Sequence, residues 1–136
     1  MRSEDIAVLK ADLFLAAIML GTGLVSGGSE ALLTVPAVGV TVAALIAISV
    51  YLAEHDVVPG VYPEVASVAA FLVTVAVGVG FVVALSATTA VVSAAALTGG
   101  GLGVTLYRLI YGVVLPVPAY RLEKDAEPEE TVEAEP

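Results

Sequence analysis

Residues 65–107 read VASVAAFLVTVAVGVGFVVALSATTAVVSAAALTGGGLGVTLY and contain no charged side chain. As an α-helix this run would be about 65 Å long, at roughly 1.5 Å per residue, whereas the hydrocarbon core of a bilayer is about 30 Å thick. The run is therefore too long for one crossing and long enough for two crossings joined by a tight turn. It predicts an integral membrane protein.

The composition of the whole chain agrees with this prediction. Of its 136 residues, 59% are hydrophobic, whereas soluble domains are about 45–50% apolar. The net charge of −9, with few lysines and many acids, resembles the composition of proteins from extreme halophiles and names no family. We expect no nucleic-acid partner, because an acidic chain is repelled by phosphate groups.

Residue types that catalysis and cofactor binding need are scarce. The chain has no cysteine and one histidine, His55, which excludes disulfides, thiolate metal sites and haem ligation by two histidines of one chain. No charged residue lies at the expected middle of a span, where such residues mark proton relays and ion pathways. We therefore predict that the protein is not an enzyme and holds no cofactor or metal. For the adjacent residues Glu54, His55 and Asp56 we predict a solvated loop, with metal binding or pH sensing as the alternative.

Four transmembrane helices are predicted in an all-α bundle, at about residues 12–29, 31–53, 65–86 and 90–110. The short link Ser26–Glu30 should join the first two as an antiparallel hairpin, and the last two should form a second hairpin. For the last turn, Ser86–Thr89 is preferred to Thr98–Gly101. The second choice would leave Arg108 near mid-membrane, at a cost of about 2.5–3.5 kcal/mol on insertion scales.

The basic residues predict the orientation. They precede the first span or lie at or beyond the end of the fourth, so an even number of crossings puts both groups on one side. The positive-inside rule makes this side, with both termini, cytoplasmic, and we expect a multi-pass protein of the cell membrane. Arg108 should reach water from the last turn of the fourth span. The side chains predicted to anchor this interface are Lys10, Tyr51, Tyr107, Arg108, Tyr111 and Arg121.

Residues 123–136, EKDAEPEETVEAEP, hold seven carboxylates and one lysine. Such a segment cannot bury enough apolar surface to offset its ordering entropy, so we predict a disordered acidic cytoplasmic tail after a transmembrane domain of residues 1–122. Between Arg108 and the tail, prolines interrupt an apolar stretch that is too short to cross again. We predict that it lies in the membrane interface, with a re-entrant element as the alternative.

Small residues recur at four-residue spacing in three predicted spans. They are Gly39, Ala43 and Ala47; Ala76, Gly80 and Ala84; and Ala95, Gly99 and Gly103. Helices in lipid associate by close van der Waals approach, which such stripes permit. The leading hypothesis is a non-enzymatic homo-oligomer, or an accessory subunit of other membrane proteins, that acts by helix packing within the lipid bilayer. A small channel or carrier for neutral solutes, with Gly99–Gly103 as a flexible element, is the alternative.

Overall fold

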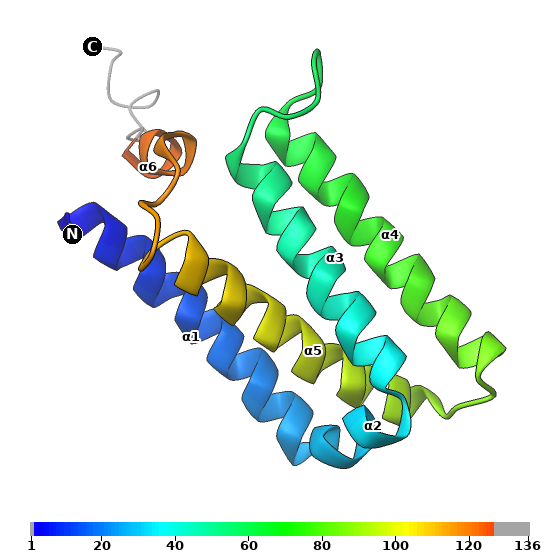
Figure 1. Ribbon diagram of the computed structural model, residues 1–136. Helices are drawn as coiled ribbons and strands as arrows, with labels where there is room; N and C mark the ends of the chain where they lie inside the picture. The colour runs from blue at the N-terminus through cyan, green and yellow to red at the C-terminus, as the bar shows by residue number, and fades with distance from the viewer. Residues whose placement is uncertain (1, 127–136) are drawn as a thin grey trace, which may run out of the picture.

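The computed structural model describes residues 2–126, which form helices joined by short connections, without a β-strand (Figure 1). The helices are α1 (Ser3–Val25), α2 (Gly28–Thr34), α3 (Pro36–Glu54), α4 (Pro63–Ala84), α5 (Thr89–Ile110) and α6 (Ala119–Ala126). Helices α1, α3, α4 and α5 are each long and apolar enough to cross a membrane. The prediction of an all-α chain with four such helices is confirmed, and so is the preferred turn between α4 and α5.

The order of the long helices differs from a pair of hairpins. Helix α5 lies between α1 and α3, and α4 packs on another side of α3 (Figure 1). Within residues 2–126, the backbone of α1 does not come close to that of α3 or α4, and α4 approaches α5 over a short stretch only. The predicted hairpin arrangement is therefore not confirmed, because the last long helix separates the first two.

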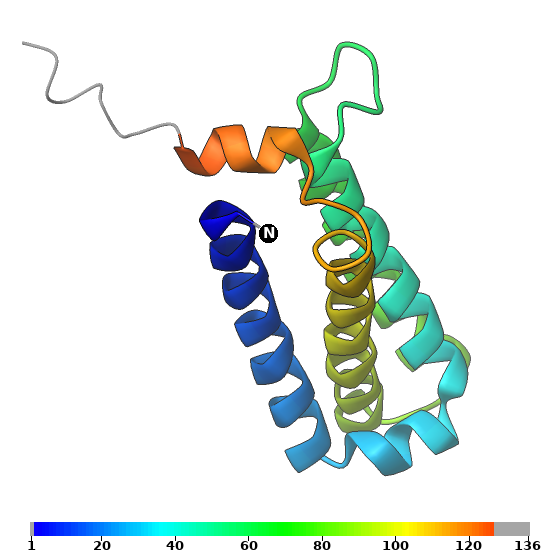
Figure 2. The same ribbon diagram turned by 60° about the vertical axis from the view of Figure 1, so that its left-hand side comes forward.

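Helix α2 spans the gap that this order creates. It runs crosswise at the end of the bundle, between the end of α1 and the start of α3 (Figure 2). Its seven residues extend over about 10 Å, roughly the diameter of one helix. The predicted span 31–53 is consequently divided at Val35, and the predicted link Ser26–Glu30 is partly helical. Pro36 starts α3, where its missing N–H costs least.

Glycines of α5 bring its backbone against that of α3. A Cβ added at Gly99 would lie 2.8 Å from the Cα atom of Gly39, and one at Gly103 would lie 2.9 Å from the Cα atom of Ala43. Neither position has room for a side chain. The stripes predicted on these two helices therefore meet each other, as close helix packing in lipid requires.

A second set of glycines brings α5 against α1. A Cβ added at Gly101 would lie 2.9 Å from the backbone nitrogen of Leu20, and one at Gly23 would lie 2.7 Å from the backbone nitrogen of Thr98. Thr98 is buried there, and its hydroxyl donates to the carbonyl oxygen of Ala94 at 2.8 Å. Glycines of α5 thus allow close approach to α3 on one side, at Gly99, and to α1 on another side, at Gly101. This explains why α5 lies between these two helices.

The other predicted packing residues are distributed unevenly. Ala95 is fully buried beside α3, and Ala47 of α3 is half-buried. The stripe of α4, formed by Ala76, Gly80 and Ala84, is exposed. Two of the three predicted stripes therefore lie in a helix contact of this chain, and the third does not.

Replacing Gly103 by Ala should destabilise the protein by about 1–3 kcal/mol, because the new Cβ overlaps the backbone of α3. Gly80→Ala is the matched control: an added Cβ meets nothing within 4 Å there, so the lower backbone entropy of Ala should leave stability equal or higher. The free energy of unfolding can be measured by SDS titration in detergent micelles, followed by circular dichroism. Equal stability of the two variants would contradict this account of the α3–α5 contact.

Candidate functional site

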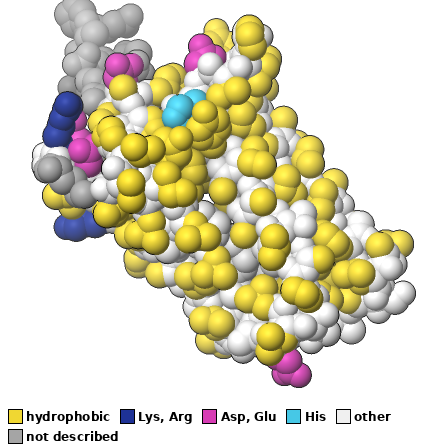
Figure 3. All heavy atoms as spheres, viewed as in Figure 1, with side chains coloured by type: hydrophobic (Ala, Val, Ile, Leu, Met, Phe, Trp, Pro, Cys, Tyr) yellow, Lys and Arg dark blue, Asp and Glu magenta, His cyan; other side chains and the backbone are white. Residues whose placement is uncertain are grey.

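Charged side chains gather at one end of the helix bundle (Figure 3). The first turns of α1, the end of α3, the start of α4, the end of α5 and the whole of α6 lie there (Figures 1 and 2). At the opposite end, among the residues that the structure describes, Glu30 in α2 is the only charged one. We call the first of these the charged end.

Arg108 is the centre of the charged end. It lies in the last turn of α5, as predicted, but its side chain is fully buried and does not reach water. Its Nε donates to Asp12 Oδ2 of α1 at 2.6 Å, and its Nη1 donates to Glu54 Oε2 of α3 at 3.2 Å. Its Nη2 contacts both carboxylates as well. Arg108 therefore joins three helices and is not the water-facing anchor that we predicted.

The planar guanidinium group suits this position. It presents five N–H donors in a rigid fork and can engage two carboxylates at once, which the ammonium group of lysine cannot do with the same geometry. Two carboxylates around one guanidinium leave an excess negative charge. Arg121 of α6 lies nearby, with its Nη2 3.7 Å from Asp12 Oδ1, so the four side chains together are electrically balanced.

Aromatic side chains surround the buried ion pairs on one side. The hydroxyl of Tyr107 donates to Glu54 Oε2 at 2.7 Å, and its ring is stacked on Tyr111, with centroids 5.0 Å apart. Tyr51 is stacked on His55 at 4.1 Å, and His55 meets Tyr111 edge-on at 5.4 Å. Three predicted anchors, Tyr51 of α3, Tyr107 of α5 and Tyr111 directly after α5, therefore form one cluster with the single histidine. Tyr107 is buried in it and is not an interfacial residue.

The remaining predicted anchors lie at the same end. Lys10 is exposed on α1, and Arg121 is half-buried on α6. For the sequence Glu54-His55-Asp56, the structure buries Glu54 and exposes Asp56, so the prediction of a solvated loop is wrong for its first residue. Within residues 2–126, no three acidic or histidine side chains come close enough to hold a metal ion.

Helix α6 lies across the charged end and connects α1 with α4 (Figure 2). Besides the contact between Arg121 and Asp12, its Tyr120 hydroxyl donates to Glu64 Oε1 at 2.7 Å, and Lys124 Nζ lies 3.1 Å from the same oxygen. Residues 123–126, predicted as the start of a disordered tail, belong to this helix. The rest of the predicted tail lies outside the described residues.

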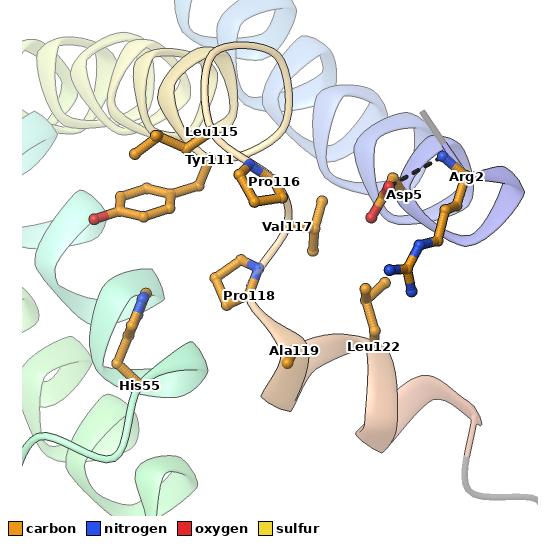
Figure 4. A pocket seen from close by; sticks show the side chains of 10 residues that line it. All are labelled: Arg2, Asp5, His55, Tyr111, Leu115, Pro116, Val117, Pro118, Ala119 and Leu122. Carbon is orange, nitrogen blue, oxygen red and sulfur yellow. Dashed lines mark hydrogen bonds between the residues drawn. The ribbon is translucent and has the colours of Figure 1, made fainter.

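A pocket of about 490 Å³ lies beneath α6, next to the aromatic cluster (Figure 4). Pro116, Pro118 and Leu122 line its middle, whereas His55 and Arg2 lie on opposite sides of it (Figure 4). The polar side chains that line this pocket do not converge on one point.

A longer groove runs between α1 and α4, the two long helices at the edges of the bundle. It consists of two hollows of about 590 and 530 Å³, and Met19, Ile46 and Phe71 line both of them. One hollow has an almost wholly apolar lining. The other reaches the charged end, where the charged side chains that line it are Asp12, Glu54, Arg108 and Arg121. We call these two hollows together the α1/α4 groove.

Reasoning from the sequence missed the contact between Arg108 and its two carboxylates. Each of the three residues stands at the edge of a predicted span and was interpreted singly, as a boundary or an anchor. A signal was present, because opposite charges at the same end of three apolar helices can pair. Buried charges in membrane proteins generally pair with one another.

No protein-family model, curated protein or solved structure matches this chain. Its class therefore rests on its own geometry: a helical protein with four helices able to span a membrane, closed at one end by buried ion pairs.

Replacing Arg108 by Gln should destabilise the protein by about 3–5 kcal/mol, because the buried carboxylate of Glu54 and the half-buried carboxylate of Asp12 would lose their shared counter-charge. Lys124→Gln, which removes the same charge from an exposed pair, should have little effect. Unfolding in detergent micelles measures both. The triple variant Arg108→Gln/Asp12→Asn/Glu54→Gln should recover part of the loss, and a triple variant less stable than the single one would contradict a role for charge pairing.

Proposed function

We propose that this is a non-enzymatic multi-pass membrane protein that acts by helix packing, as a homo-oligomer in which α4 docks on α4 of a second copy. The exposure of α4 carries the proposal. Only 6% of its most apolar stretch is buried, against 50% for α5. Its stripe of small residues at Ala76, Gly80 and Ala84 is exposed, and a Cβ added at Gly80 meets nothing within 4 Å.

The contact between α3 and α5 supports this use of the α4 stripe. In that contact, stripes of the same four-residue spacing bring two helix backbones together at Gly39 and Gly99. Lipid chains are as apolar as leucine, so close backbone approach is what favours a helix neighbour over lipid. A stripe that packs on its own copy forms a closed, two-fold symmetric interface, which limits assembly to a dimer. Association with a different membrane protein, as an accessory subunit, is the alternative outcome.

The glycines of α5 favour packing over transport. The hypothesis of a channel or carrier uses Gly99–Gly103 as a flexible element, and each glycine inside a helix costs about 1 kcal/mol relative to alanine, which calls for a reason. The contacts of Gly99 with α3 and of Gly101 with α1 account for that cost without a solute pathway.

We also propose that the charged end faces the cytoplasm and that the membrane is the cell membrane. The charged end holds the basic residues at both ends of the described chain, including Lys10 on α1 and Lys124 on α6, whereas α2 at the opposite end has none. This distribution follows the positive-inside rule.

Gly80→Leu should convert the dimer to a monomer, because a bulky side chain would hold the two backbones apart. Val79→Leu, a neighbouring exposed position outside the stripe, is the control and should stay dimeric. Size-exclusion chromatography with light scattering in mild detergent measures the mass of the protein. A wild-type protein that is monomeric, with no partner after mild solubilisation, would contradict the proposal.

Single cysteines introduced into this cysteine-free chain can test the orientation. An impermeant thiol reagent on intact cells should label Ser29→Cys in α2 and should leave Val61→Cys, at the charged end, unlabelled. Both positions are exposed. Permeabilised cells should label at both positions, which is the control for reactivity. The reverse pattern on intact cells would invert the proposed topology.

A further inference from the structure

The α1/α4 groove is open to the surroundings of the helices. Its walls are α1 and α4, whose backbones do not come close to each other, and its floor is formed by α3 and α5. A molecule dissolved in the membrane can enter it sideways, without passing through the protein. Its two hollows, of about 590 and 530 Å³, fall in the range of about 300–1,000 Å³ that is usual for small-molecule sites.

The groove has the polarity of an amphiphile. Along α3 it extends from Val42, in the apolar hollow, to Glu54 at the charged end, a distance of about 18 Å along the helix axis. One leaflet contributes about half of a hydrocarbon core that is about 30 Å thick. The groove is therefore about as long as the lipid chains of one leaflet, and its polar residues lie where that leaflet has its headgroups.

The charged side chains at the polar end of the groove favour a charged lipid headgroup over an apolar helix as its occupant. Two acids and two bases line the hollow there, so the net charge is zero while both signs are present. Arg121 and Asp12 are the two of these side chains that are partly exposed, at 30% and 18%, and their Nη2 and Oδ1 atoms lie 3.7 Å apart. An apolar transmembrane helix would cover these side chains without offering charges in return, which is costly in a medium of low dielectric constant. A headgroup with one phosphate and one ammonium group can pair with both.

We infer that the α1/α4 groove binds a zwitterionic phospholipid, with an acyl chain along the apolar hollow, the phosphate beside Arg121 and the ammonium group beside Asp12. This inference does not depend on self-association through α4. The groove and the α4 stripe lie on different faces of that helix, because Gly78 lines the groove and Gly80, two residues later, does not.

The two glycines of α4 offer a matched pair of variants for testing the acyl-chain site. A Cβ added at either position meets nothing within 4 Å, so a side chain introduced at either one starts in open space. Gly78→Leu fills the groove and should lower the amount of bound phospholipid several-fold, whereas Gly80→Leu should bind as much as wild type. Native mass spectrometry of the full chain in mild detergent, with added phosphatidylethanolamine, counts bound lipid per chain. Equal binding by the two variants, or no lipid bound to wild type, would overturn the site.

The headgroup assignment is tested with an equimolar mixture of phosphatidylethanolamine and phosphatidylglycerol. Wild type should retain the zwitterionic lipid in several-fold excess over the anionic one. Arg121→Gln should reduce retention, whereas Lys124→Gln, which removes a charge from the same helix outside the groove, should not. Preference for the anionic lipid, or equal effects of the two substitutions, would overturn the assignment. Loss of lipid from Gly78→Leu with the dimer intact would separate this site from the proposed function.

Discussion

The pairing of Arg108 with Asp12 and Glu54 is the interaction on which the helix order depends. Glycine contacts allow α5 to approach α1 and α3, but close approach alone is compatible with several arrangements of apolar helices. A buried ion pair is selective, because separating its partners leaves uncompensated charges at several kcal/mol each. An arrangement that moved α5 away from either neighbour would leave such a charge unpaired. Steric fit in the middle of the helices and charge pairing at one end therefore favour the same order.

The four helices able to cross a membrane could be predicted from the sequence, because long apolar runs alternate along the chain with short segments that hold most of the charged residues. The turn between α4 and α5 could be predicted because this choice keeps Arg108 away from mid-membrane, where its insertion free energy is least favourable. The neighbours of each helix could not be found in this way. Stripes of small residues occur on α3, α4 and α5 alike, and only those of α3 and α5 meet in the chain. Spacing predicts that a face can pack closely, and it does not say against which helix.

The incorrect predictions for residues 123–126 and for Glu54 have a common cause: each was made from the composition of a whole segment. The composition of residues 123–136 is that of a disordered tail, yet the first four residues of this segment continue a helix that begins at Ala119. The contacts of that helix with Asp12 and Glu64 depend on residues far away in the sequence. Glu54 was likewise grouped with its neighbours in a loop, although its partners are Arg108 and Tyr107. The structure at these positions depends on contacts with residues far away in the sequence, and the sequence around each position does not show those contacts.

The sequence separation within the ion-pair cluster has a consequence for biosynthesis. Asp12 and Arg108 are 96 positions apart, and Glu54 and Arg108 are 54 apart. At translation rates of about 5–20 residues per second, α1 waits on the order of 5–20 s for its partner helix to leave the ribosome. During this interval the carboxylate of Asp12 lacks the guanidinium group of Arg108. Helices α1 and α3 are both made by then, but their backbones do not pack against each other in the folded chain. For the membrane protein proposed above, helix α5 inserts between two segments that are already in the membrane, so α1 and α3 have to stay apart, or separate again, until it arrives.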